Sequence, residues 1–260
     1  MAAFPNALRR KFAGMAFIQT DAYTLRNYEC DAAGRLSIPA LMNLMQESAN
    51  RNAYDYGIDS ETLQANGLGW MLMRFGLVMH HYPRSGQTIR IVTYPTGVEK
   101  FFVYRDFRVY ADAVLLAEAT STWLVFDSHK RTMVPTPDFI RSLVCPDVDQ
   151  PSPRLPLKPN YPSVEVAEEA QAVTVGWFDI DSNQHVNNVV YIRWLLEQLP
   201  DAVLQTQELA ELDVVYRNET HWHERVLVQH QADDAGTFHH RLALAETGKD
   251  VLLARTRWRR

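Results

Sequence analysis

Residues 31–47 of the chain read DAAGRLSIPALMNLMQE, and they align without gaps on residues 181–197, which read DSNQHVNNVVYIRWLLE. Each stretch begins with an aspartate in a polar loop and continues into an apolar-periodic segment. Residues 101–117 (FFVYRDFRVYADAVLLA) align in the same way on residues 238–254 (FHHRLALAETGKDVLLA). Identities are few, but the order and similar spacing of the two matches indicate that one structural unit occurs twice.

Each copy combines one helix with several strands. Apolar residues at helical spacing predict helices over residues 38–50, with Pro39 near the start, and over residues 189–199. Strand signals follow each helix, at residues 70–81, 88–94, 100–110 and 114–126 and then at residues 212–216, 225–231, 238–246 and 251–258. One helix for four or five mostly antiparallel strands predicts an α+β fold in which a sheet wraps over a helix.

Proline is concentrated between the two copies, at positions 146, 151, 153, 156, 159 and 162. A proline-rich stretch is extended and semi-rigid, which is typical of a linker. We therefore predict an N-terminal domain over residues 1–144, a linker over residues 145–165 and a C-terminal domain over residues 166–260.

Composition narrows the functional classes. The 260 residues are 47% hydrophobic and carry a net charge of -5, so no excess of basic charge points to a nucleic-acid partner. No stretch approaches the roughly 20 apolar residues that a membrane span requires. Cys30 and Cys145 are the only cysteines, which is too few for a disulfide framework. These features predict a cytoplasmic protein without a membrane span.

Residues 179–188 read DIDSNQHVNN and immediately precede the second apolar helix. Aspartate and asparagine are common at helix N-termini, so a purely structural role is one interpretation. A calcium loop is excluded because its glycine position holds Gln184 and its bidentate glutamate position holds Val190. A catalytic role is the third interpretation, and the duplication favours it. In the first copy Ala33 stands opposite Asn183 and Arg35 opposite His185.

The same residues carry a family resemblance. The stretch DIDSNQHVNNVVYIRWLLEQLP, with TVGWFDID before it, LDVVYRNE after it and WMLMRFGLVMHHYPRSGQTIRI in the first half, closely resembles the acyl-acyl carrier protein thioesterases of plants and bacteria. The resemblance implies two tandem hotdog domains, each an antiparallel sheet wrapped around a central helix. It also implies hydrolysis of fatty acyl-acyl carrier protein, with the carrier protein as partner and with no metal or cofactor.

The resemblance transfers functional residues as well. The family's D-x-N-x-H motif matches Asp181, Asn183 and His185, and its downstream glutamate matches Glu219. Plant members have a cysteine at the next position, where this chain has Thr220, so we expect water to attack the thioester. We expect Asp181 or Glu219 to activate that water.

Two further sets of residues are expected to contact the substrate. Backbone N–H groups of Asn188 and Val189, at the start of the second helix, are expected to receive the oxyanion. Because the first copy lacks the catalytic side chains, we expect it to shape the acyl pocket through bulky residues, namely Met42, Met45, Trp70 and Met73.

A basic stripe on the last predicted strand is a candidate docking surface. Arg255, Arg257 and Arg259 alternate and would project from one face, where an acidic carrier protein could bind. The alternative is a solvated sheet edge protected against aggregation by its charge.

Other functions remain as alternatives. The main one is an acyl-CoA thioesterase of the same fold, because coenzyme A carries the same arm and thioester. A hotdog-type hydratase or dehydratase and a non-enzymatic acyl-binding protein fit the four polar residues less well. The sequence leaves open the acyl chain length and whether the fused pair forms a homodimer.

Overall fold

The computed structural model describes residues 16–164, 171–233 and 235–260. The first copy contributes β1 (Gln19–Thr24), η1 (Asn27–Glu29), α2 (Ile38–Asp55), α3 (Ser60–Gln64), β2 (Leu68–Met79), β3 (Thr88–Val98), β4 (Phe102–Ala111), β5 (Val114–Asp127), β6 (Thr132–Val134) and α4 (Asp138–Arg141). The second contributes β7 (Gln171–Thr174), η2 (Trp177–Asp179), α5 (Asn188–Glu197), α6 (Asp201–Thr206), β8 (Glu208–Tyr216), β9 (Arg225–Ala232), β10 (Thr237–Leu244) and β11 (Asp250–Arg259).

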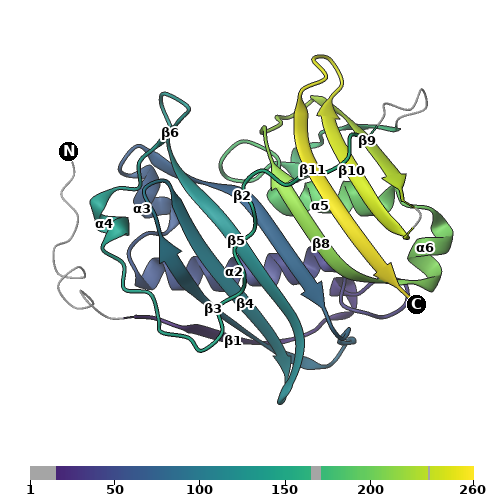
Figure 1. Ribbon diagram of the computed structural model, residues 1–260, viewed down its shortest axis with the longest axis horizontal. Coiled ribbons are helices and arrows are strands. Elements are labelled where there is room, and N and C mark those ends of the chain that lie inside the picture. Colours follow the sequence, from purple (N-terminus) through teal and green to yellow (C-terminus); the bar gives the residue numbers. More distant parts are fainter. Residues whose placement is uncertain (1–15, 165–170, 234) are drawn as a thin grey trace.

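The strands form one continuous antiparallel sheet in the order β1-β3-β4-β5-β2-β8-β11-β10-β9-β7, with β6 beside β5. The second half of this order repeats the first half in reverse, as expected for two equivalent units placed side by side (Figure 1). The two halves join where β2 pairs with β8, from Arg74 opposite Val215 to Val78 opposite Glu211. The predicted α+β fold with two tandem hotdog units is confirmed.

The central helices α2 and α5 lie on one side of the sheet (Figure 1). The Ser37 side chain caps α2 by accepting from the N–H of Ala40, and Pro39 occupies an early helical position that needs no hydrogen bond. Apolar residues of both helices are buried in one core with the inner faces of the strands. The helix α2 continues to Asp55, beyond the predicted end, whereas α5 ends at Glu197, and Pro200 is the N-cap of the short helix α6 that follows.

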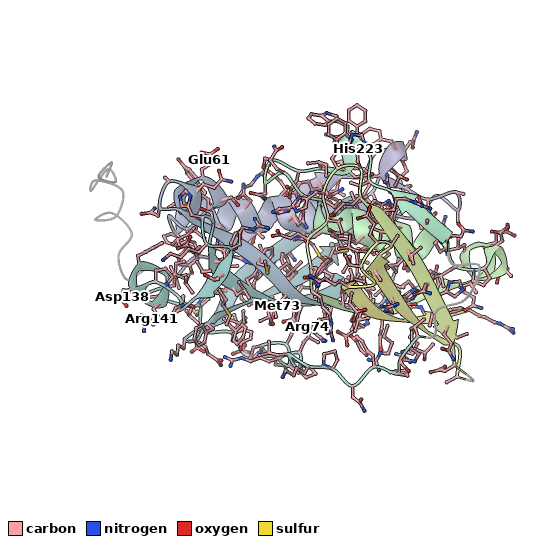
Figure 2. All side chains as sticks on the ribbon, turned by 90° about the horizontal axis from the view of Figure 1, so that it is seen from above. Glu61, Met73, Arg74, Asp138, Arg141 and His223 are labelled. Carbon is pink, nitrogen blue, oxygen red and sulfur yellow. The ribbon has the colours of Figure 1, made fainter. Side chains whose placement is uncertain are left out.

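The proline-rich segment crosses the sheet face opposite the helices (Figure 2). In residues 145–164 there is no helix or strand. The segment is fixed where Ser152 N–H donates to Asp106 Oδ2 at 2.6 Å and where Arg108 donates to the Gln150 carbonyl at 3.0 Å. A Cβ built on Gly76 would lie 3.1 Å from Leu155, so this strand position allows close approach of the segment. The domain boundaries proposed from the sequence stay a prediction.

Strand β2 contains a β-bulge between Leu72 and Arg74, where its register with β5 shifts. The extra residue, Met73, has no partner on β5. Beyond the bulge, Phe75 faces the helices, while Arg74 is fully buried on the opposite face. None of the helices in the described ranges has the length and apolar character to cross a membrane.

Candidate active site

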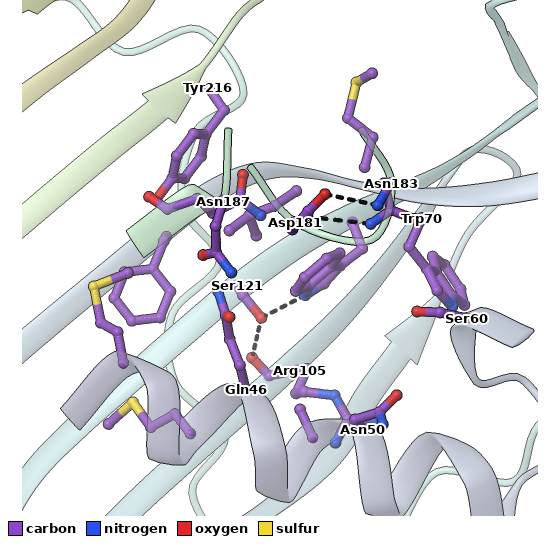
Figure 3. A pocket seen from close by; sticks show the side chains of 18 of the residues that line it. Gln46, Asn50, Ser60, Trp70, Arg105, Ser121, Asp181, Asn183, Asn187 and Tyr216 are labelled. Carbon is purple, nitrogen blue, oxygen red and sulfur yellow. Dashed lines mark hydrogen bonds between the residues drawn. The ribbon is translucent and has the colours of Figure 1, made fainter. Parts of the chain in front are cut away.

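The polar loop before α5 is a tight turn with its own hydrogen-bond network. Ile180 and Val186 form an isolated β-bridge, and Asp181 N–H donates to the His185 carbonyl at 2.9 Å. Asp181 Oδ1 accepts from the Asn183 N–H at 2.8 Å, and Oδ2 accepts from the Asn183 side chain at 3.3 Å (Figure 3). The network fixes the side chains of Asp181, Asn183 and His185 at one wall of a cavity.

Glu219 reaches the same cavity from the segment after β8. The next residue, Thr220, is fully buried, and its carbonyl accepts from the Val186 N–H at 2.9 Å. The Thr220 hydroxyl lies 2.8 Å from the Tyr191 hydroxyl, which also accepts from the Thr220 N–H at 3.0 Å. Thr220 therefore connects the segment that carries Glu219 to α5 and to the polar loop before α5 through hydrogen bonds.

The imidazole of His185 lies between two carboxylates. Its Nδ1 is 3.8 Å from Asp181 Oδ1, and its Nε2 is 3.4 Å from Glu219 Oε1. Burial lowers the pKa of His185, Asp181 opposes this effect, and Arg131 and His221 lower the pKa further. His185 is therefore neutral at pH 7, a form that can both accept and donate a proton.

The start of α5 offers fewer backbone donors than expected. The Asn187 side chain caps the helix and accepts from the Val189 N–H at 2.9 Å. This bond occupies Val189, so Val189 is not a free oxyanion donor in this structure, contrary to the expectation from sequence. Asn188 occupies the first helical position, where an N–H has no intrahelical acceptor, and it lines the cavity.

The cavity has a volume of about 410 Å³ and extends from the polar loop before α5 to α2 and β2 of the first copy. Met42 and Met45 of α2 and Trp70 of β2, which the sequence assigned to an acyl pocket, line this cavity. Met73 does not, and that part of the prediction is wrong. The β-bulge removes Met73 from the inward alternation, and Figure 2 shows it beside Arg74, away from the helices. Met71 lines the cavity instead.

A buried arginine lies in the cavity wall (Figure 3). Arg105 is 7% exposed, and its Nη1 donates to Asn52 at 2.8 Å and to Thr93 at 3.1 Å. Burial lowers the pKa of Arg105 to about 10, so it remains cationic at neutral pH. Arg105 has no signal in the sequence, because its strand position alone does not distinguish a buried arginine from an exposed one.

Two side chains of the first copy contact residues of the second copy that are predicted to be catalytic. Arg131, in the turn between β5 and β6, forms an ion pair with Glu219. Gln64, the last residue of α3, donates to Asn183 Oδ1 at 3.0 Å. Neither contact has a sequence signal, because both join segments far apart in the chain.

A second groove of about 520 Å³ lies on the other side of the catalytic loop, between the N-terminal ends of α2 and α5. Asp181 and Asn187 line both this groove and the cavity. Tyr28 and Phe178 occupy equivalent positions in the two copies and flank the groove, with exposed fractions of 77% and 97%. Side chains this exposed and apolar are typical of a binding surface.

The arginine stripe on β11 does not face the cavity. Arg255 pairs in register with Asp213, which contacts Arg74 on the sheet face opposite the helices. Arg257 forms an ion pair with Glu211, and Arg259 lies 3.6 Å from Glu208. Two of the three charges are paired and all three lie on the sheet face opposite the helices, so the docking role stays a prediction and would involve a surface away from the cavity. The stripe also fits the alternative of a charged, solvated sheet surface.

No group of three or more histidine, cysteine, aspartate or glutamate side chains within the described ranges is arranged to hold a metal ion. Cys30 and Cys145 are free thiols. The site is thus a cluster of two carboxylates, an imidazole and an amide in the wall of a cavity. On a double-hotdog fold, these features define the class of acyl-thioester-processing proteins.

Comparison with known proteins specifies the family. Residues 17–144 match the acyl-ACP thioesterase N-terminal domain, and residues 163–260 match the acyl-ACP thioesterase C-terminal domain. The chain belongs to the acyl-ACP thioesterase family.

Relatives and solved structures agree with this assignment. The chloroplastic acyl-[acyl-carrier-protein] hydrolase FATB3 of Cuphea viscosissima is 30% identical over 98% of the chain and 66% of its own length. The chloroplastic palmitoyl-acyl carrier protein thioesterase of Cuphea hookeriana is 31% identical, over 95% and 63%. The chain thus spans less than two thirds of these relatives. The structure of the 12:0-ACP thioesterase from Umbellularia californica has the same fold, with a TM-score of 0.83, 24% identity and coverage of 95% and 99%.

Proposed function

We propose that this chain hydrolyses the thioester between a fatty acyl group and the phosphopantetheine arm of acyl carrier protein, releasing the free fatty acid. The observation that carries the proposal is the row of Asp181, His185 and Glu219 in the wall of a cavity lined by methionine and aromatic side chains. The names of the family and of the relatives support the choice of an acyl-carrier protein substrate.

In the proposed reaction, a water oxygen attacks the thioester carbonyl carbon and its proton passes to a carboxylate. The geometry favours Glu219 as that base, because its Oε1 lies 3.4 Å from His185 Nε2, to which it can pass the proton, whereas both oxygens of Asp181 accept hydrogen bonds from Asn183. His185, whose Nε2 lies 3.4 Å from Glu219 Oε1, takes this proton and passes it to the leaving sulfur as the C–S bond breaks, so that Glu219 is again a carboxylate and His185 again neutral. The Asn188 N–H, at the positive end of the α5 dipole, stabilises the oxyanion in the intermediate.

The cavity and the groove, which lie on either side of Asp181, suggest how the substrate binds. The acyl chain occupies the cavity beside α2, where methionine adapts to irregular apolar shapes. The carrier's arm approaches through the groove flanked by Tyr28 and Phe178. We retain the cytoplasm as the proposed compartment on composition, whereas the curated relatives named above are chloroplastic.

The test is release of free fatty acid from a panel of acyl-carrier proteins of different chain length, beside the same acyl groups on coenzyme A. We expect a higher kcat/KM on the carrier-protein esters. A higher kcat/KM on the coenzyme A esters would instead identify an acyl-CoA thioesterase. Absence of hydrolysis on both carriers would refute the proposed activity.

A further inference from the structure

We propose that Arg131, a residue of the first copy, is a positioning residue that holds Glu219 toward His185 in the active site of the second copy. The inference rests on the proposed catalytic role of Glu219. It makes the β5–β6 turn part of the active site, and it makes the site dependent on the contact between the two halves.

The turn is built to hold Arg131 in one place. Asp127 Oδ1 accepts from the N–H groups of His129 and Lys130, at 2.9 Å each, and the Arg131 N–H donates to the Asp127 carbonyl at 2.8 Å. Arg131 has φ 55°, a left-handed conformation that an L-residue rarely adopts. Its guanidinium carbon lies 5.6 Å from the ring centroid of Phe126, within the range of a cation–π contact.

The two oxygens of Glu219 have separate partners. Arg131 Nη2 contacts Oε2, whereas Oε1 lies 3.4 Å from His185 Nε2. A guanidinium that fixes one oxygen orients the whole carboxylate, because the group is planar and rigid. The ion pair therefore directs Oε1 to the imidazole and the cavity. The Glu219 side chain is 19% exposed, so solvent screens the pair only partly.

The charge of Arg131 also affects the pKa of His185. The groups that face this imidazole are Asp181 from its own loop, Glu219 and His221 from the segment after β8, and Arg131 from the β5–β6 turn. Among them, Arg131 and His221 lower the pKa of His185. Loss of the Arg131 charge should therefore raise that pKa, which a purely structural role in the turn would not do.

The decisive experiment compares Arg131→Met, Arg131→Lys and Lys130→Met. Both positions are solvent-accessible, and Lys130 is the matched control because its side chain is 79% exposed and its ion pair is with Asp127 of the same turn. We expect Arg131→Met to lower kcat about ten- to hundredfold, the scale of a lost hydrogen bond between charged groups, with little change in KM. Arg131→Lys should restore part of this loss, and Lys130→Met should behave as wild type.

A double-mutant cycle tests whether Arg131 acts through Glu219. In the Glu219→Gln background, Arg131→Met should cost little more, because the carboxylate that it positions is already gone. Titration of His185 by NMR gives a readout that needs no substrate, and Arg131→Met should shift its midpoint to higher pH. The inference is overturned if Arg131→Met leaves kcat and the His185 midpoint unchanged, or if its effect is undiminished beside Glu219→Gln. Failure of wild type to hydrolyse acyl-carrier protein would refute the proposed function and leave the NMR test standing.

Discussion

Gln184 has φ 69° at the position where Gly34, its counterpart in the first copy, has φ 72°. The surrounding bonds also repeat: Gly34 N–H donates to the Asp31 carbonyl at 2.9 Å, and Gln184 N–H donates to the Asp181 carbonyl at 3.0 Å. The two copies thus share one loop conformation. Only the second copy has a non-glycine residue in this left-handed conformation. The residue lies beside the predicted catalytic side chains, and backbone strain is often found at functional sites.

Exchanging these residues should therefore have unequal effects. Gly34→Gln should lower the free energy of unfolding by about 1 kcal/mol, because a side chain disfavours the left-handed region. Gln184→Gly should leave it unchanged or raise it by up to about 1 kcal/mol, since relief of strain competes with the greater unfolded-state entropy of glycine. Urea denaturation of both variants measures the difference. Equal destabilisation by the two changes would contradict the shared-loop argument.

Substitution of the predicted catalytic residues should lower kcat, whereas substitution of the first-copy counterpart Asp31 should not. Asp181→Asn, His185→Ala and Glu219→Gln should each reduce kcat by at least roughly a hundredfold, the scale of an acid-base or oxyanion group. Asp31→Asn is the control, since Asp31 accepts from its own loop and from Arg35 Nε at 3.0 Å. Steady-state hydrolysis of acyl-carrier protein tests all four. If Asp31→Asn abolished turnover and Asp181→Asn did not, the active site would belong to the first copy.

The repeat, the two helices and most strands could be predicted because they depend on periodicity, which is local information. The cluster of Asp181, Asn183 and His185 was recognisable because its counterpart in the first copy has changed. The structure places these residues together with Glu219, while their proposed roles stay predictions.

Features that depend on register or on distant contacts could not be predicted. Met73 was assigned to the cavity as a bulky residue of the strand, but a β-bulge at this position changes which residues of β2 face the helices. Val189 was expected to be a free donor, but the cap formed by Asn187 occupies its N–H. The contact of Arg131 with Glu219 joins residues of different copies, so no local sequence pattern predicts it.

Thr220 should contribute to stability and not to chemistry. Thr220→Ala removes the buried hydrogen bond to the Tyr191 hydroxyl and should lower the free energy of unfolding by about 1–2 kcal/mol. Because the backbone bonds of Thr220 remain, kcat should stay within about threefold of wild type, less than the loss of one hydrogen bond would cause. Urea denaturation and hydrolysis measured on the same preparation separate the two effects. A hundredfold loss of kcat would give the hydroxyl a catalytic role.

A buried histidine should make stability depend on pH. Burial lowers the pKa of His240 to about 3, while its Nε2 lies 2.8 Å from the Thr256 hydroxyl. Between about pH 6.5 and 3, the unfolded chain binds a proton at this histidine that the folded chain does not. The free energy of unfolding should therefore fall as the pH drops through this window. His240→Gln should reduce the slope of unfolding free energy against pH between 6.5 and 5, as measured by urea denaturation. An unchanged slope would show that His240 is not the source.

The cavity wall should determine which acyl chains are hydrolysed. Met42 and Met71 line the cavity, whereas Met73 does not, so the three methionines form a matched set. Met42→Ala and Met71→Ala enlarge the space beside the acyl chain and should shift the ratio of kcat/KM toward longer chains. One methylene in an apolar pocket is worth about 1–3 kcal/mol, so shifts of at least roughly tenfold are expected between neighbouring even chain lengths, which differ by two methylenes. Met73→Ala should leave the preference unchanged. The measurement is kcat/KM on a series of acyl-carrier proteins, with activity on some chain length retained in every variant. A shift caused by Met73→Ala alone would mean that the substrate lies on the other side of β2.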